Sequence, residues 1–319
     1  MIQLSLNDAW SKPMIAPTAP MPPDFAAPAP PEATAAPANN DAKNDADGKA
    51  VPPKTASIGQ SDVVKSFLLR LQELGLSTVS GTDGNDVLSG WSNSLADAGD
   101  GNDTIDVWSG SVVDAGAGND TVRAWSDSRV HGGDGDDRID AWSESQVDGG
   151  AGNDTIHVWS NSIVSGGSGD DRIDAWSGAQ VDGGDGNDVI SVWSDSKASG
   201  GAGNDSIYAA AGNAIVNGGT GDDLISVGDN STISFAAGDG KDTVYADRNT
   251  RLDFGQGISA AGTHVSVSGQ TATITFDGSD DKITMNLHPR GPATLAFADG
   301  STLSVSAEAT PTAPLDKLA

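Results

Sequence analysis

The sequence contains no cysteine, few basic residues and no long apolar segment. Without cysteine the chain forms no disulfide bond, so its stability must come from packing, hydrogen bonds and bound ions. Lys and Arg number 17 against 45 Asp and Glu, which gives a formal net charge of −28. This acidity argues against nucleic acid as a partner and favours cations. No apolar run is long enough to cross a membrane, so we expect no transmembrane segment.

Signals for targeting and for catalysis are also missing. The first residues, Met1–Asp8, lack a basic region followed by an apolar core, so we expect no cleaved N-terminal signal peptide. Residues 1–60 are dominated by Pro and Ala and are predicted to be disordered. The chain has no His-Glu-x-x-His, no Gly-x-Ser-x-Gly and no P-loop, and the segment before the repeats is too short and proline-rich for a catalytic domain. We therefore expect no enzymatic activity.

What the sequence does contain is a 17-residue repeat. Seven tryptophans share this spacing: Trp91, Trp108, Trp125, Trp142, Trp159, Trp176 and Trp193. A fixed short period over such a length predicts stacked, nearly identical coils. In one unit Val122 and Ala124 are two residues apart and Val130 follows on the return strand, so a strand geometry points all three inward. The repeat predicts an all-β protein, a right-handed parallel β-roll or β-helix solenoid of 17-residue coils.

Different patterns flank the repeats. Residues 61–78 have apolar side chains at helical spacing, which predicts a short amphipathic helix that caps the N-terminal end of the solenoid. The repeat array covers residues 79–250. Residues 251–306 carry short alternating segments separated by turns, which predict a small β cap, and residues 307–319 are expected to form a loose tail.

A glycine–aspartate turn precedes each tryptophan, as in Gly116-Ala117-Gly118-Asn119-Asp120. Stacked coils would bring the aspartates into one column, where they would repel each other unless cations lie between them. Carboxylate and carbonyl oxygens are the ligands that Ca²⁺ prefers. We therefore expect a column of Ca²⁺ ions along this side. The candidate aspartates are Asp86, Asp103, Asp120, Asp137, Asp154, Asp171, Asp188, Asp205, Asp223 and Asp242. The candidate glycines are Gly99, Gly101, Gly116, Gly118, Gly133, Gly135, Gly150, Gly152, Gly167, Gly169, Gly184, Gly186, Gly201 and Gly203.

These units resemble the glycine–aspartate nonapeptide repeats of RTX (repeats-in-toxin, haemolysin-type) calcium-binding proteins. The resemblance covers roughly residues 81–247, and the segment from Leu252 to Ser301 resembles the C-terminal cap of that family. It implies a parallel β-roll with Ca²⁺ bound between adjacent coils by the turn glycines and aspartates. It also implies a secreted, extracellular protein, exported by the type I secretion machinery through an uncleaved C-terminal signal.

The chain departs from the family pattern in two ways. The family usually has a glycine–aspartate turn on both sides of each coil, whereas this chain has Trp-Ser-x-Ser on the second side, as in Trp125-Ser126-Asp127-Ser128. We therefore expect one column of Ca²⁺ and not two. Thr82 replaces a glycine in the first turn and Lys241 replaces Asn or Asp in the last, which makes the two end sites atypical.

The tryptophans themselves allow two interpretations. Strand alternation points them outward, where neighbouring rings would lie about 4.8 Å apart and could stack as a structural ladder. Alternatively, the seven tryptophans form an exposed stripe that binds a partner such as a glycan, a lipid or ice. A second outward row, with Asp106, Arg123, Asp140, His157 and Asp174, alternates in charge and suggests stabilising cross-strand pairs.

Together these features predict a secreted calcium-binding RTX repeat protein that folds on binding Ca²⁺ outside the cell and acts as a non-enzymatic extracellular binding or structural protein, with a glycan, matrix or host-surface partner. Two alternatives remain: a secreted effector or membrane-active protein delivered to a host, and a glycan- or ice-binding solenoid that uses the Trp-Ser-x-Ser ladder.

Overall fold

The computed structural model describes residues 77–289 and 291–307. The predicted disordered segment, nearly all of the predicted capping helix and most of the predicted tail lie outside these residues. The described part is almost entirely β-strand, with one short 3₁₀ helix, η2, at Ala260–Gly262. No helix in this part is both long and apolar enough to cross a membrane.

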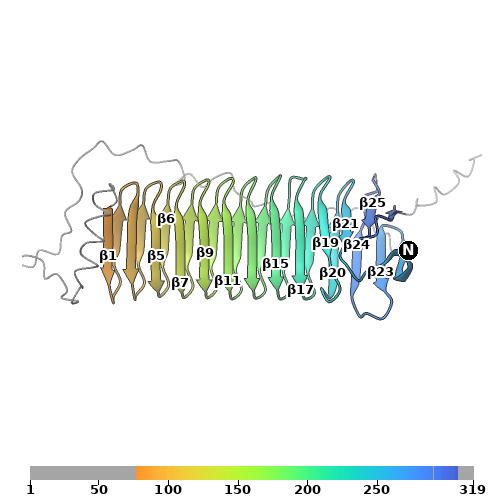
Figure 1. Cartoon of the computed structure of the whole chain (residues 1–319), viewed down its shortest axis with the longest axis horizontal. Helices are drawn as coiled ribbons and strands as arrows, with labels where there is room; N and C mark the ends of the chain where they lie inside the picture. The colour runs from red at the N-terminus through yellow and green to blue at the C-terminus, as the bar shows by residue number, and fades with distance from the viewer. Residues whose placement is uncertain (1–76, 290, 308–319) are drawn as a thin grey trace, which may run out of the picture. The chain divides into compact units, whose positions relative to one another are not determined.

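The chain winds through two parallel sheets that lie face to face, with each coil adding one strand to each sheet (Figure 1). The first sheet contains, in spatial order, β1 (Ser77–Thr82), β3 (Ser94–Gly99), β5 (Val112–Ala117), β7 (Arg129–Asp134), β9 (Gln146–Ala151), β11 (Ile163–Ser168), β13 (Gln180–Asp185), β15 (Lys197–Ala202), β17 (Ile215–Thr220), β19 (Thr232–Phe235), β21 (Arg251–Phe254), β25 (Ala293–Ala296) and β26 (Thr302–Val305). The second contains β2 (Val87–Gly90), β4 (Thr104–Val107), β6 (Thr121–Ala124), β8 (Arg138–Ala141), β10 (Thr155–Val158), β12 (Arg172–Ala175), β14 (Val189–Val192), β16 (Ser206–Ala209), β18 (Leu224–Val227), β20 (Lys241–Ala246), β24 (Lys282–Asn286), β23 (Thr271–Phe276) and β22 (Thr263–Ser268).

The register between coils is the 17-residue period itself. In the second sheet Ile139 pairs with Ile156, and Ile156 pairs with Ile173, so identical side chains stack on each other. These isoleucines are fully buried, and Val130, Val147 and Val164 are buried in the facing sheet. The core is therefore a thin layer of small aliphatic side chains, as predicted. Burial of these columns is the apolar contribution that holds the coils together.

Two boundaries differ from the sequence prediction. Ser77 and Thr78, predicted to end the helix, instead begin β1 and pair with Ser94 and Leu95 of β3. The reason is that the Ser-Thr-Val segment can extend the parallel ladder by two residues, which a helix could not do. At the other end β21 pairs in parallel with β19, so the roll continues through Phe254 before the cap begins.

The C-terminal strands close the solenoid by changing direction. β23 runs antiparallel to β24 and to β22, and β26 runs antiparallel to β25. Inside this end the thin aliphatic core gives way to packed aromatic rings, with Phe254 in contact with Phe235, Phe276 and Phe297 at centroid distances of 6.1, 5.5 and 5.2 Å. These aromatic side chains cover the end of the aliphatic core, where the described strands change from parallel to antiparallel pairing.

Candidate metal-binding edge

The turns that lead from the first sheet to the second form one edge of the solenoid, which we call the Gly-Asp edge. Each contains glycines with positive φ, such as Gly133 at 116° and Gly135 at 124°. A Cβ atom added to Gly133 would lie 1.8 Å from the carbonyl oxygen of Gly116 in the previous coil. Glycine is required here both by the backbone conformation and by the close approach of the neighbouring turn.

The aspartates at the end of these turns stack in a column, and each uses one carboxylate oxygen to join two coils. The backbone N–H of Asp137 donates to Oδ1 of Asp154 at 2.8 Å, and that of Asp154 donates to Oδ1 of Asp171 at 2.8 Å. The same bond is present from Asp86, whose N–H donates to Asp103, through to Asp223, whose N–H donates to Asp242 at 3.1 Å. One oxygen of each carboxylate, Oδ1, is thus used in a hydrogen bond that holds neighbouring coils in register.

The second oxygen of these carboxylates is buried and has no hydrogen-bond partner. This holds for Oδ2 of Asp103, Asp120, Asp137, Asp154, Asp171, Asp188, Asp205 and Asp223. Leaving a buried polar group unsatisfied costs on the order of 1–3 kcal/mol, and more when the group is charged. Eight such oxygens in one column therefore require a partner from outside the chain.

A backbone oxygen faces the same space as each of several of these carboxylates. A Cβ added to Gly132 would lie 2.3 Å from Asp137 Oδ2 and 2.3 Å from the carbonyl oxygen of Gly149 in the next coil. We call such a space, between an aspartate Oδ2 and the next coil's carbonyl, a glycine cradle. The other complete cradles, with both oxygens 2.1–2.4 Å from the added Cβ, are at Gly149, Gly166, Gly183 and Gly200, whereas at Gly81 the carbonyl oxygen of Ala98 lies at 2.1 Å and Asp86 Oδ2 farther away, at 2.8 Å. All the ligands at this edge are oxygens, which is the donor set that Ca²⁺ takes.

Carboxylates alone do not complete a site. Among the described residues no three His, Asp or Glu side chains gather closely enough to hold a metal ion. The column offers about one free carboxylate oxygen per coil, so backbone carbonyls and water would have to supply the remaining ligands. Six to eight oxygens, many of them carbonyls, are usual for Ca²⁺, so the residues fit this ion.

Burial also makes the negative charge of this column costly. It raises the pKa of Asp137 to about 7, against the lowering effect of the hydrogen bond from Asp120. Burial likewise raises the pKa of Asp171 to about 7 and that of Asp242 to about 8. Neighbouring aspartates add to the shift by repulsion. A divalent cation beside these groups would stabilise the ionised form.

A second side-chain ladder runs along the exposed side of the same turns, in the opposite direction. The backbone N–H of Asn102 donates to Oδ1 of Asn85 in the previous coil at 3.0 Å, and Asp170 bonds to Asn153 in the same way at 2.7 Å. The last member, Lys241, donates its N–H to Asp222 at 3.0 Å. The side chain of residue 241 does not have to accept a hydrogen bond from a following turn. Its neighbour in the sheet is β24, which the chain reaches from β23 and not through another glycine–aspartate turn. This explains why lysine is tolerated there.

The opposite turns form what we call the Trp-Ser edge, where the indoles stack. Centroid distances are 4.9 Å for Trp108–Trp125, 4.6 Å for Trp125–Trp142, 5.1 Å for Trp159–Trp176 and 5.2 Å for Trp176–Trp193, with planes within 13° of parallel. Trp91 is farther from Trp108, at 6.5 Å. The rings are partly exposed, with Trp91 at 40% and Trp176 at 36%. Because ring faces inside the stack cover each other, the ridge presents mainly ring edges to solvent.

Under the indoles lies a row of buried serines. The hydroxyl of Ser111 donates to the carbonyl of Trp108 at 2.5 Å and accepts from the backbone N–H of Ser94 at 3.1 Å. The residue between the two serines is left-handed, with φ of 60° at Asp127 and 65° at Glu144. Among the described serines of this row only Ser128 Oγ is buried without a partner, so this edge is satisfied almost entirely by its own hydrogen bonds, in contrast to the Gly-Asp edge.

On the outer face of the second sheet, the predicted alternating row forms a network centred on His157. Its Nδ1 lies 3.1 Å from Asp140 Oδ1 and its Nε2 lies 3.4 Å from Asp174 Oδ2. Arg138 and Arg172 pair with the same two aspartates at 2.8 Å. These bonds raise the pKa of His157, mainly through Asp140 and then Asp174. The network links three coils and has the character of a stabilising surface cluster.

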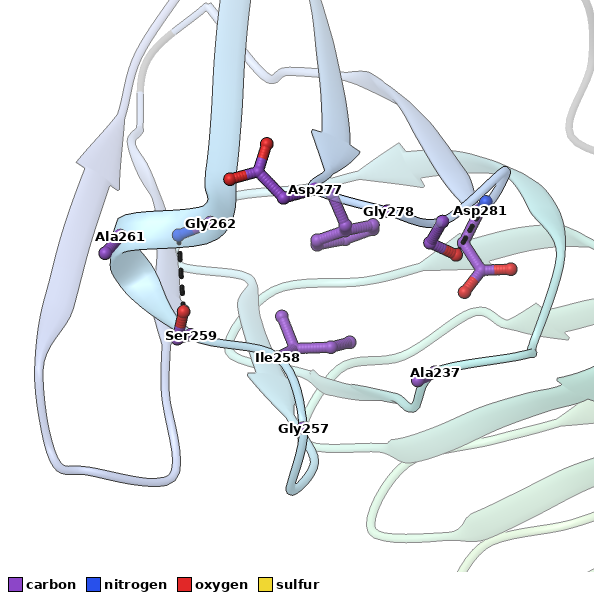
Figure 2. A pocket seen from close by; sticks show the side chains of 11 residues that line it. Ala237, Gly257, Ile258, Ser259, Ala261, Gly262, Asp277, Gly278 and Asp281 are labelled. Atoms are coloured by element: carbon purple, nitrogen blue, oxygen red, sulfur yellow. Dashed lines mark hydrogen bonds between the residues drawn. The ribbon is translucent and has the colours of Figure 1, made fainter.

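The C-terminal end holds a half-open cavity of about 560 Å³ that the sequence did not predict (Figure 2). Ile258 and Phe276 contribute apolar side chains, and Asp277 and Asp281 contribute carboxylates. Asp281 accepts a hydrogen bond from Gly238 at 2.8 Å, and Ser259 accepts one from Gly262 at 3.2 Å. Its polar groups are thus largely engaged in holding the loops of the cap.

Comparison with known proteins agrees with the geometry of the repeats. A family model described as the RTX calcium-binding nonapeptide repeat (4 copies) matches residues 111–129, 146–162, 160–179, 180–196 and 197–229. Among solved structures, that of the extracellular lipase LipA from Serratia marcescens aligns with 56% of this chain and 38% of the lipase chain, at 17% sequence identity and a TM-score of 0.29. The comparison with curated protein sequences gives no match.

The sequence match and the stacked turns describe the same part of the molecule. The matched ranges lie between residues 111 and 229, where each coil places one glycine-rich turn and one buried aspartate on the same edge. The repeats between residues 111 and 229 are therefore RTX calcium-binding nonapeptide repeats.

Proposed function

We propose that this chain is an extracellular solenoid that folds on binding Ca²⁺ along the Gly-Asp edge and has no enzymatic activity of its own. The observation that carries the proposal is the column of eight buried Oδ2 atoms without a partner. A fold that buries these groups is costly without a cation, so the free energy of Ca²⁺ binding becomes free energy of folding.

The proposed sites are the aspartates whose Oδ2 is free, from Asp103 to Asp223, which gives up to eight ions in one column. Extracellular calcium modules bind with Kd of about 10⁻⁴–10⁻³ M, far above the free Ca²⁺ concentration of a cytosol. The chain would then stay largely unfolded before export and would fold afterwards. RTX repeat proteins are typically secreted, and we propose the type I machinery as the route for this chain.

The decisive measurement is circular dichroism of the full chain during a Ca²⁺ titration, paired with calorimetry to count ions. We expect little β signal in EDTA and a cooperative rise at Ca²⁺ concentrations of about 0.1–1 mM. Mg²⁺ at the same concentration is the control, because it demands tighter octahedral geometry and keeps its waters. A complete β signal in EDTA would overturn the proposal.

The export route has its own test. We expect a deletion of the last 50 residues to abolish secretion through a type I apparatus and a deletion of residues 1–60 to leave it intact. The reverse pattern would indicate an N-terminal route and would contradict this part of the proposal.

The absence of catalysis is supported by the make-up of the cavity in Figure 2. Its lining residues include two serines and two aspartates but no histidine or lysine to activate a serine. The nearby His264 is paired with Asp277 at 2.7 Å, and Ser259 accepts a hydrogen bond from Gly262. Hydrolysis of ester, glycoside and peptide substrates by the calcium-loaded chain should therefore equal the background rate.

A second candidate function is recognition of an extracellular partner by the Trp-Ser edge. The partly exposed indole ridge favours it, because aligned aromatic residues on a surface often mark an interaction site. Glycans usually stack on ring faces, which neighbouring rings cover here, so a partner would have to contact ring edges. Binding of the wild type and a Trp125→Ser/Trp159→Ser variant to glycan arrays and to zwitterionic liposomes would test this. Equal binding of both would exclude the edge as the contact surface.

A further inference from the structure

The coils of the Gly-Asp edge do not all provide the same space for an ion. The position that is glycine in the complete cradles, such as Gly132 and Gly149, is alanine in two earlier coils. Gly116 of the fifth strand pairs with Gly133 of the seventh, so Ala115 is equivalent to Gly132. Ala98 occupies the same position one coil earlier. Both alanines have 0% exposure, so their methyl groups point into the roll.

A methyl group at this position fills the cradle. At Gly166 an added Cβ would lie 2.2 Å from Asp171 Oδ2 and 2.4 Å from the carbonyl oxygen of Gly183. A Cβ is bonded directly to Cα, so the ion itself cannot occupy this position. A methyl group here instead prevents Oδ2 and the carbonyl oxygen from keeping the places they have in the glycine coils, and it therefore displaces two candidate Ca²⁺ ligands. In the coils of Asp103 and Asp120 the carboxylate can be shifted to avoid the methyl group, but its Oδ2 remains buried and unpaired.

In the first coil a side chain and a backbone N–H of the protein itself bind the aspartate oxygen that is free in the coils after it. Oδ2 of Asp86 accepts hydrogen bonds from the backbone N–H of Thr82 at 2.6 Å and from its hydroxyl at 2.9 Å. Asp86 therefore differs from its neighbours Asp103 and Asp120, whose Oδ2 is buried without a partner, because its own Oδ2 accepts both hydrogen bonds from Thr82.

We propose that the Gly-Asp edge contains a central block of tight calcium sites and an N-terminal block of weak ones. The tight sites are those of Asp137, Asp154, Asp171, Asp188 and Asp205, each beside a complete glycine cradle. The weak sites are those of Asp103 and Asp120, beside Ala98 and Ala115, and Asp86 holds no ion. This inference rests on the proposed function, because it assigns different affinities to the same column of sites. As Ca²⁺ concentration rises, the central coils would therefore bind Ca²⁺ and become ordered before the N-terminal coils.

The first test is hydrogen exchange of the full chain at stepwise Ca²⁺ concentrations. We expect amides of residues 132–210 to gain protection at lower Ca²⁺ than amides of residues 94–124, with midpoints at least about tenfold apart. Simultaneous protection of both blocks would overturn the inference. A chain that never gains protection with Ca²⁺ would instead overturn the proposed function, so the two failures are distinguishable.

The second test restores the missing cradles. The double substitution Ala98→Gly/Ala115→Gly should bring the midpoint for residues 94–124 down to that for residues 132–210, although glycine ordinarily weakens a strand. Ala151→Gly is the control, because Ala151 is exposed at the end of β9 and its replacement adds backbone entropy of the same kind without opening a cradle. Unchanged midpoints in the double variant, or an equal change in the control, would contradict the inference.

Gly166→Ala makes the opposite change in the central block. We expect it to weaken binding at Asp171 alone, so calorimetry should count one fewer tight ion. If the added methyl group prevents folding of the whole chain, the two alanine-to-glycine substitutions still decide the question, since they create no steric conflict.

Discussion

The Gly-Asp edge and the Trp-Ser edge of the solenoid differ in how their turns satisfy buried polar groups. On both edges a tight turn must reverse the chain and satisfy buried polar groups. The Trp-Ser edge does this with its own serine hydroxyls and covers the turn with stacked indoles. The Gly-Asp edge leaves eight carboxylate oxygens without a partner. The Trp-Ser edge satisfies its buried polar groups within the chain, with Ser128 Oγ as the exception among the described serines, and the Gly-Asp edge, as we propose, depends on an ion from solution.

This difference indicates how the protein can be stable in one environment and not in another. The Trp-Ser edge contributes the same packing free energy whether or not Ca²⁺ is present. Under the proposed function, the Gly-Asp edge opposes folding without Ca²⁺ and supports it with Ca²⁺. The predictions below separate the two edges, from the largest expected effect to the smallest.

The largest contrast should come from glycine-to-alanine substitutions on the two edges. Gly167→Ala places a Cβ 1.9 Å from the carbonyl of Gly150 at φ 117°, and we expect it to cost more than ~3 kcal/mol of unfolding free energy in saturating Ca²⁺. Gly178→Ala on the Trp-Ser edge, at φ 75°, meets only the flexible side chain of Asn161, and we expect about 1–2 kcal/mol. Urea denaturation measures both, and equal costs would contradict the steric difference between the edges.

Charge removal should affect only the ion-dependent edge. Asp171→Asn can keep the Oδ1 bond to the previous coil but replaces the free Oδ2 with an amide group, so we expect the Ca²⁺ midpoint for folding to rise at least about tenfold, or about 1.4 kcal/mol. Asp170→Asn is the matched control one residue away, since its exposed oxygen can still accept from Asn187. Its midpoint should not move. A similar shift in both variants would show that net charge, and not the buried oxygen, sets the affinity.

Loss of an indole should reduce stability without changing calcium affinity. Trp125 contacts rings on both sides at 4.9 and 4.6 Å, so we expect Trp125→Ala to lower the unfolding free energy by about 2–4 kcal/mol. Trp91→Ala, at the end of the ladder with its neighbour 6.5 Å away, should cost less than half of this. Unfolding at saturating Ca²⁺ gives these values. A large change in calorimetric Ca²⁺ affinity would mean that the edges are coupled.

The smallest effect concerns His157, on the sheet face between the edges. Its pKa is raised in the folded state by Asp140 and Asp174, so its contribution to stability is full below its unfolded pKa of about 6.5 and is lost as pH rises through the folded value. We therefore expect the stability difference between the wild type and His157→Gln to shrink by less than ~1 kcal/mol between pH 6 and pH 8.5. Thermal unfolding in saturating Ca²⁺ measures this, and a difference that grows with pH would contradict the assignment.

The repeat made most of the fold predictable. Because Ile139, Ile156 and Ile173 occur at one spacing, the coil length, the inward positions and the parallel stacking follow from the sequence. The outward position of the tryptophans follows from alternation, and their stacking distance follows from strand spacing. The start of the roll at Ser77 was not predicted, because short β-branched segments next to a helical pattern carry no clear boundary signal.

The residues of the aspartate column could be predicted from the sequence, but the role of each carboxylate oxygen could not. Periodicity indicates that the aspartates form a column, but it does not tell which carboxylate oxygen is free, since that depends on how each backbone N–H faces the next coil. The left-handed position between the two serines was also missed. Its signal is in the sequence, because Asn93, Gly110, Asp127, Asn161 and Gly178 are all residues that tolerate positive φ. Glu144 also has a positive φ, 65°, although glutamate rarely adopts it, so the residue types at this position do not form a consistent sequence pattern.

The two side-chain ladders of the Gly-Asp edge run in opposite directions, and this has a consequence for how such a protein can change in evolution. The aspartate of each coil accepts from the coil before it, whereas the Asn or Asp beside it accepts from the coil after it. Every interior coil therefore offers the same pair of complementary surfaces to its neighbours. A whole 17-residue unit could be gained or lost by recombination without creating an unmatched junction. Length in this protein is thus a quantity that selection can adjust in discrete steps, while the ends, with Thr82 and Lys241, are the parts that must be kept.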